Sequence, residues 1–237
     1  MMKNKKTIWI YPLIIIGILV VITNSCSKKD DNNTVTDIDG NVYHTVTIGT
    51  QVWMVENLKT TRYRDGSAIP KINDSAAWSN LTTGAYCDYS NIPGNSTTYG
   101  RLYNWYVVND SRNIAPAGWH VPTDGEWNIM EKYLDNTVDT TATGLAGTDI
   151  GGKLKETGTT HWASPNTGAT NSSGFTALPG GFRSGVFFGF GSNACWWSAT
   201  ESTVTNAWDR YLSSDNAKVD RGSYGKIDGY SIRCIKD

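Results

Sequence analysis

The chain has 237 residues and a formal net charge of −1 at neutral pH. This length suits one or two globular domains, and the lack of excess positive charge argues against a nucleic-acid-binding protein. With 10 Trp, 12 Tyr and 24 Gly, the chain is expected to build much of its core from large rings and glycine turns.

The N-terminus has the pattern of a secretory signal. Lysines precede an uncharged apolar run over residues 8–22, which is short for a bilayer-spanning helix of about 20 residues. A retained anchor helix is the alternative. The run ends at Ser25-Cys26, which resembles the cleavage box of bacterial lipoproteins, although Thr23 stands where that box usually has leucine. In this interpretation residues 1–25 are removed and Cys26 becomes a lipidated first residue.

Residues 26–35 are expected to form the lipidated cysteine and a flexible tether. Their lysines followed by acids, over 27–33, resemble the export signal of Bacteroidetes lipoproteins that reach the outer face of the outer membrane. A plain solvated tether is the compatible alternative. The resemblance implies an outer membrane lipoprotein exposed at the cell surface, with the membrane as a partner through its lipid.

The remaining residues, 36–237, show no second linker and no internal repeat, and so indicate one domain. Alternating side chains over 41–48, a turn at Gly49 and a second run over 51–58 predict a β-hairpin. Three further short elements follow, at 74–78 (a helical turn), 85–89 (a strand) and 99–108 (a strand or a helix).

The stretch AGWHVPTDGEWN, residues 117–128, places a histidine and two acids close together. Thr123 and Glu126 have the spacing of a capping box, in which each side chain binds the backbone amide of the other residue. Asp124 then lies in the first helical turn, where negative charge suits the helix dipole. A buried stripe follows at Trp127, Met130 and Leu134. We therefore predict a helix over 124–134 and interpret its acids as structural.

The second half of the domain predicts further short elements. Residues 151–156 predict a short helix, and the alternation of glycine with apolar residues over 185–191 predicts a mobile apolar loop. That loop lacks the following Lys and Ser/Thr of a phosphate-binding loop. Three strand candidates near the C-terminus predict an antiparallel sheet, at 195–200, 207–212 and 229–235.

Seven segments of the chain, in this order, resemble the Fibrobacter succinogenes major paralogous (FISUMP) domain. They are 37–43, 48–58, 99–105, 118–123, 178–181, 196–198 and 231–234. Together they span about 36–237. The resemblance implies an α+β fold like that of the formylglycine-generating enzyme and the C-type lectins, with short twisted antiparallel strands, about two helices and long irregular loops. It implies no particular reaction.

Three cysteines remain after Cys26, and the residues alone leave three pairings of Cys87, Cys195 and Cys234 open. The resemblance implies a Cys87–Cys234 disulfide and a free Cys195, because this family usually has cysteines at the first two positions. A loop of that length would contribute on the order of 4 kcal/mol in the chain-entropy model.

The residues give little support to an enzyme. Formylglycine-generating enzymes hold copper with two closely spaced cysteines, which this chain lacks, and its histidines His44, His120 and His161 are far apart in the sequence. His120 is interpreted as a satisfied core histidine. We expect no catalytic residues, no metal ligands and no cofactor, with calcium left open by the lectin resemblance. The alternative is an enzyme related to formylglycine-generating oxidases, or an unidentified hydrolase.

A recognition or adhesion domain for a glycan or a protein fits the sequence better. Rings and long polar loops suit recognition, because rings supply large contact area at small entropy cost. The lectin resemblance places a ligand face between about residues 183 and 220. Candidate ligand-binding residues there are Arg183, Phe187, Phe188, Trp208, Asp209, Arg210 and Asp215. The Glu-Pro-Asn and Gln-Pro-Asp signatures of sugar-binding C-type lectins are missing.

Overall fold

The computed structural model describes residues 1–2 and 33–237. The chain divides into two units, 1–31 and 32–237, and the fold below is that of the described residues of the second, 33–237. The predicted lipidation site Cys26, and the predicted signal segment beyond its first two residues, lie outside the described residues. Within the described part, no helix has both the length and the apolar character needed to cross a bilayer.

A five-stranded antiparallel sheet has the order β1-β2-β3-β13-β6. Its strands are β1 (Thr34–Thr36), β2 (Val42–Ile48), β3 (Gln51–Met54), β13 (Ile235–Lys236) and β6 (Trp119–His120). The predicted hairpin is confirmed, with Gly49 at φ +62° in its turn. Because β1 pairs with β2, the folded sheet begins at Thr34, inside the segment expected to be tether.

A four-stranded antiparallel sheet has the order β10-β11-β12-β7. Its strands are β10 (Asn193–Glu201), β11 (Asn206–Ser213), β12 (Val219–Gly225) and β7 (Gly144–Ala146). The first two C-terminal strand predictions are confirmed, whereas the third, over 229–235, holds only for isolated β-bridges at Gly229, Tyr230 and Ser231 and for Ile235. The third strand is β12, whereas within 229–235 only Ile235 belongs to a strand, in the other sheet. The sequence of β12 lacks the apolar alternation typical of a strand, because Asp220 and Gly222 occupy one of its faces.

Two small hairpins complete the strands. They are β4 (Tyr86–Cys87) with β5 (Leu102–Tyr103), and β8 (Phe182–Ser184) with β9 (Val186–Phe188). The prediction of a mobile loop over 185–191 is therefore wrong for residues 186–188, which form β9. Gly185, at φ +72°, makes the tight turn that lets Phe188 pair with Phe182.

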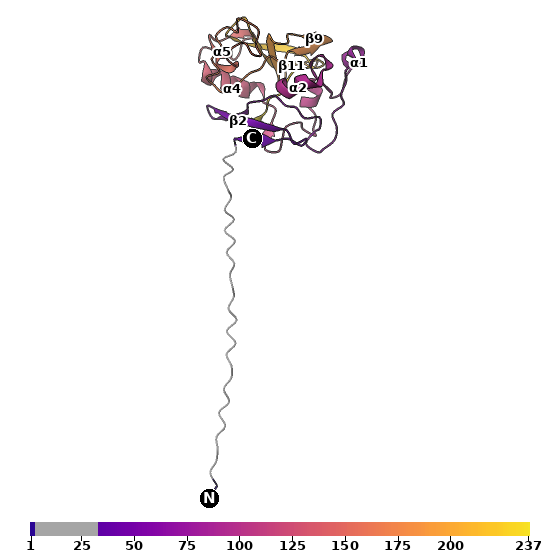
Figure 1. Cartoon of the computed structure of the whole chain (residues 1–237), viewed down its shortest axis with the longest axis vertical. Helices are drawn as coiled ribbons and strands as arrows, with labels where there is room; N and C mark the ends of the chain where they lie inside the picture. The colour runs from indigo at the N-terminus through magenta and orange to yellow at the C-terminus, as the bar shows by residue number, and fades with distance from the viewer. Residues whose placement is uncertain (3–32) are drawn as a thin grey trace. The chain divides into compact units, whose positions relative to one another are not determined.

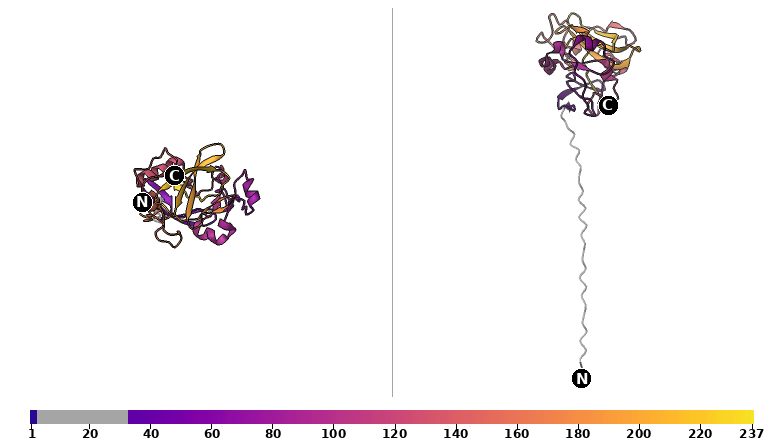
Figure 2. Two further views of the ribbon diagram at one scale, coloured as in Figure 1. Left: turned by 90° about the horizontal axis from the view of Figure 1, so that it is seen from above. Right: turned by 90° about the vertical axis from the view of Figure 1, so that its right-hand side faces the viewer.

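Five short α-helices and one 3-10 turn join the strands, so the expectation of about two helices is wrong. They are α1 (Ser75–Ser79), η1 (Tyr89–Asn91), α2 (Pro93–Tyr99), α3 (Trp105–Val108), α4 (Asp124–Leu134) and α5 (Ile150–Leu154). Helix α4 has the predicted bounds, and both halves of its capping box are present: the Thr123 side chain accepts from the Glu126 amide, and the Thr123 amide donates to the Glu126 carboxylate at 2.8 Å. In the folded unit, α1 and α2 lie on one side and α4 and α5 on the other (Figures 1 and 2).

The core is divided by the four-stranded sheet. Trp196 and Trp197 are neighbours on β10, and successive side chains of a strand point to opposite faces. Trp196 packs in one cluster with Trp53 and Trp127, whereas Trp197 packs in another with Tyr230. The overall architecture is a mixture of helices and mostly antiparallel strands, as the α+β prediction expects.

The cysteines are not paired as the resemblance implies. Cys87, Cys195 and Cys234 are all free and buried. Cys87 packs with Trp78 in one apolar cluster, whereas Cys234 lies in a different cluster. The expected Cys87–Cys234 disulfide is therefore absent from the structure, because each thiol is enclosed by its own set of apolar side chains.

Candidate functional site

The four-stranded sheet has two chemically different faces. Side chains alternate along a strand, so Asp209 and Tyr211 of β11 point to one face and Arg210, between them, points to the other. Gly222 of β12 and Trp197 of β10 lie directly opposite Asp209 in the register. The two faces therefore have separate roles, one structural and one a candidate for binding.

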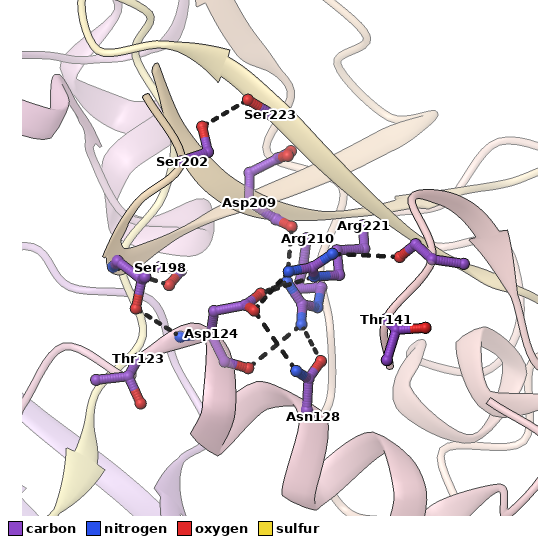
Figure 3. A network of polar contacts seen from close by, with 12 residues as sticks. Thr123, Asp124, Asn128, Thr141, Ser198, Ser202, Asp209, Arg210, Arg221 and Ser223 are labelled. Atoms are coloured by element: carbon purple, nitrogen blue, oxygen red, sulfur yellow. Dashed lines mark hydrogen bonds and ion pairs between the residues drawn. The ribbon is translucent and has the colours of Figure 1, made fainter. Parts of the chain in front are cut away.

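The Arg210 face is joined to helix α4 by a buried polar network. The guanidinium of Arg210 donates to the carboxylate of Glu131, to Asp124 Oδ1 at 2.8 Å and to Asn128 Oδ1 at 2.7 Å. Figure 3 shows Arg210 and Arg221 approaching Asp124 from the sheet. The burial of Glu131 raises its pKa despite the opposing charge of Arg210. Asp124, from the stretch over residues 117–128, and Glu131 thus fix α4 to the sheet.

Arg221 of β12 extends this network to the candidate residue Trp208. Its guanidinium donates to both carboxylate oxygens of Asp124, at 2.9 and 2.7 Å, and lies 3.6 Å from the centroid of the Trp208 ring. Stacking of a guanidinium on an aromatic face is favourable. Trp208 and Arg210, both proposed from the sequence as ligand residues, are therefore placed in contacts within the fold.

The Asp209 face carries a cavity of about 100 Å³. Its lining comes from β8, β10, β11, β12 and the segment that follows β12. The lining residues are Phe182, Ser184, Cys195, Asp209, Tyr211, Tyr224, Asp228 and Tyr230. We call this cavity the Asp209 pocket. No lysine or arginine is among these residues, and four of the eight carry aromatic rings.

Asp209 is the most unusual group in this pocket. It is 1% exposed, and its Oδ1 atom has no hydrogen-bond partner within the described residues. Burial raises its pKa well above the usual aspartate value, and the charge of nearby Arg210 offsets only part of this rise. Figure 3 shows the Asp209 carboxylate on the side of the strand away from the contacts between Arg210 and Asp124. A buried acceptor left without a partner is costly and calls for an explanation.

Other ionisable groups on this face share the same environment. Asp220 lies on the same face of β12 by its register opposite Tyr211. Burial raises the pKa values of both Asp220 and Asp228. Burial, followed by the charges of these acids and Asp209, raises the pKa of the Cys195 thiol well above its usual value. The face thus concentrates carboxyl groups in a setting that favours their neutral forms.

A row of aromatic rings borders the pocket. Phe188 stacks on Phe182 with ring centroids 5.6 Å apart, and Phe182 meets the edge of Tyr230 at 5.8 Å. Tyr230 in turn meets Tyr224 at 6.1 Å. The two outer rings are open to solvent, with Phe188 46% and Tyr224 48% exposed. The row therefore joins the buried lining to the surface.

Gly222 keeps room beside the unpartnered oxygen. A Cβ atom at this position would lie 2.5 Å from Asp209 Oδ1 and 2.4 Å from the Tyr224 ring. Both distances are below any ordinary contact, so a larger residue would have to displace two lining side chains. The absence of a side chain at residue 222 is thus part of the pocket's construction.

The other candidates from the sequence lie elsewhere. Arg183 is buried and donates to the carbonyls of Ile72 and Asn73, at 2.9 and 3.0 Å. Phe187 packs on Tyr89 at 5.1 Å, and Asp215 lies exposed in the turn after β11. Of the seven candidates, only Asp209 lines the pocket, and Phe188 belongs to the aromatic row beside it.

The histidines are held separately. His44 bonds Glu56, His161 bonds Glu156, and His120 lies between Glu126 and Asp237 at 2.8 and 2.6 Å. These carboxylates raise the pKa of His120, although burial opposes them. No group of three or more His, Cys, Asp or Glu side chains suited to a metal occurs in the described part of the chain.

Sequence reasoning missed most of the pocket. Tyr211 lies two residues after Asp209 on β11, and Tyr224 lies two residues after Gly222 on the paired strand β12. Each pair therefore shares one face of the sheet, which the sequence indicates once the two strands are known. Phe182, Asp228 and Tyr230 come from outside these strands, and no local signal connects them with Asp209.

The family model described as the Fibrobacter succinogenes major domain matches residues 46–236. The chain belongs to this family. The match includes every residue that lines the Asp209 pocket. No curated protein and no solved structure matches the chain.

Three of the segments that carry the family resemblance meet inside this Fibrobacter succinogenes major domain. The Asn57 side-chain oxygen accepts from Trp196 Nε1 at 2.8 Å and from Arg233 Nη2 at 2.8 Å. All three residues are buried. These motif residues therefore hold the domain together and lie outside the set that lines the pocket.

Proposed function

We propose that this chain is a non-catalytic recognition domain whose ligand site is the Asp209 pocket. One observation carries the proposal: a buried carboxylate oxygen without a partner faces a cavity bordered by solvent-exposed rings. Ligand sites combine apolar walls with a few convergent polar groups. A ligand donor that reaches Oδ1 would supply the hydrogen bond that the folded chain does not supply.

The cellular setting is part of the same proposal. The N-terminal pattern supports a lipid on Cys26 and a place on the outer membrane facing the exterior, where a recognition or adhesion domain would meet glycan or protein ligands. The fold like that of the C-type lectins and of the formylglycine-generating enzyme, the sulfatase-modifying factor, is likewise proposed from the resemblance. Labelling of intact cells with a membrane-impermeant reagent, with Cys26→Ser as the unanchored control, tests this setting.

Occlusion of the pocket tests the binding function. The whole chain and its Gly222→Ala variant would be probed on glycan and peptide arrays, with Gly94→Ala as the matched control. Gly94 has nothing within 4 Å of an added Cβ, whereas Gly222 has two lining side chains there. We expect Gly222→Ala to weaken the signal about tenfold or more, equivalent to about 1.4 kcal/mol, while Gly94→Ala retains it.

The fold of both glycine variants would be checked by circular dichroism and urea denaturation. Ligand binding that Gly222→Ala leaves at full strength would contradict the assignment of the pocket. An array without any signal for the wild-type chain would contradict the recognition function itself.

A further inference from the structure

The Asp209 pocket contains acidic side chains and no basic ones. Asp209 and Asp228 both line it, Asp220 lies on the same face, and no basic side chain is in the lining. The guanidinium of Arg210, whose charge acts on Asp209, is bound on the opposite face of the sheet to Glu131. A ligand that brings its own positive charge would therefore meet carboxyl groups with no competing cation.

The walls of the pocket are suited to a cation on an apolar stem. Phe182, Tyr211, Tyr224 and Tyr230 surround the carboxyl groups. The faces of aromatic rings attract ammonium and guanidinium groups, and the attraction strengthens where water is excluded. The same rings pack well against methylene groups. The carboxyl groups thus suit the charged end of a basic side chain, and the rings suit both that charge and the methylene groups behind it.

The size of the cavity and the arrangement of its carboxyl groups favour an organic cation over a metal ion. The cavity of about 100 Å³ suits a slender head group. Among the described residues, Asp209, Asp220 and Asp228 do not come together as a three-ligand metal group. An ammonium group needs only one or two acceptors and an aromatic wall.

We propose, on the basis of the recognition function above, that the Asp209 pocket binds a lysine side chain of a polypeptide partner. The ammonium group donates to Asp209 Oδ1, the methylene stem lies between the rings, and Phe188 and Tyr224 contact the partner's chain at the mouth. Asp209 releases its proton to solvent as the ammonium enters, and apart from this proton transfer no covalent bond is made or broken.

This proton release makes binding tighter at higher pH over the range in which Asp209 ionises. The titratable and charged groups that face Asp209 come from every neighbouring element. They are Cys195 from β10, Tyr211 from β11, Asp220 and Tyr224 from β12, and Asp228 and Tyr230 from the segment after it, while the charge of Arg210 acts from the opposite face of the sheet. Because the other carboxyl groups also favour their neutral forms, the pH dependence is expected to be broad.

Calorimetric titration of the whole chain with Nα-acetyl-lysine methylamide tests the proposal. The uncharged comparison is Nα-acetyl-norleucine methylamide, which keeps most of the stem and lacks the ammonium group. We expect the norleucine compound to bind at least about tenfold more weakly, and Asp209→Asn to weaken the lysine compound by a similar factor. Asp215→Asn, which removes an exposed carboxylate outside the pocket, should leave the affinity unchanged.

Other outcomes would overturn the proposal. These are equal binding of the lysine and norleucine compounds, binding of glucosamine in place of lysine, or displacement of the lysine compound by calcium chloride. If an uncharged array ligand depends on Gly222 while the lysine compound does not bind, the recognition function stands and the lysine proposal falls. If no ligand depends on Gly222, both fall.

Discussion

Replacement of Arg210 by methionine is expected to lower the free energy of unfolding by about 3–5 kcal/mol. The substitution leaves Glu131, which is only 1% exposed, without the charge that compensates it. Breaking one side of a buried ion pair costs this much because the remaining charge stays desolvated. Urea denaturation at neutral pH, analysed by linear extrapolation, measures the change.

The double variant Arg210→Met/Glu131→Leu separates lost charge compensation from lost packing. It should recover a large part of the loss, because no unpaired charge is then left at residue 131. Arg221→Met is the matched single variant, and we expect a smaller loss, since Glu131 keeps its contact with Arg210. A double variant no more stable than Arg210→Met would show that the pair is not what fixes α4 to the sheet.

Replacement of Asp209 by asparagine is expected to have the opposite sign and to stabilise the domain at neutral pH by about 1–3 kcal/mol, because asparagine cannot ionise and the folded chain no longer has to hold a buried acid protonated above its usual pKa. The folded-state pKa of Asp209 is raised above its usual value of 3.8. Its contribution to stability is therefore fully present below about pH 4 and is lost as the pH rises towards the raised pKa. The advantage of the asparagine variant should be small at pH 4 and grow towards pH 7.

Urea denaturation at several pH values checks this dependence, with Asp215→Asn as the control. Asp215 is exposed and its pKa is lowered, chiefly by a hydrogen bond from Ser213, so its replacement should give no stabilisation at pH 7. A binding group that weakens the fold is expected of a functional site, where stability is often given up for activity. If Asp209→Asn instead destabilised the domain equally at all pH values, Asp209 would have a structural hydrogen bond.

Local signals in the sequence predicted local structure well. Thr123 and Glu126 lie three residues apart and define the start of α4 by themselves, and the alternation before Gly49 defines the first hairpin. Strand β12 was missed because Asp220 and Gly222 interrupt the apolar alternation that marks a strand. They interrupt it because they belong to the pocket face, so the local rule failed at the candidate site.

The site itself depended on information that is not local. The sequence places Asp209 and Arg210 together as candidate ligand residues, but neighbours on a strand point to opposite faces, and only the tertiary structure shows which face meets α4. Phe182 and Tyr230 reach Asp209 through the packing of separate segments. The implied Cys87–Cys234 disulfide failed for the same reason, since two family positions do not by themselves give proximity.

The ionisation of the Asp209 carboxyl group decides whether the pocket is built as proposed, and carbon-13 NMR of labelled aspartate, assigned with Asp209→Asn, measures it. We expect a midpoint well above the usual value of 3.8, which falls when Nα-acetyl-lysine methylamide is added. A midpoint at or below the usual value, unchanged by that compound, would contradict it.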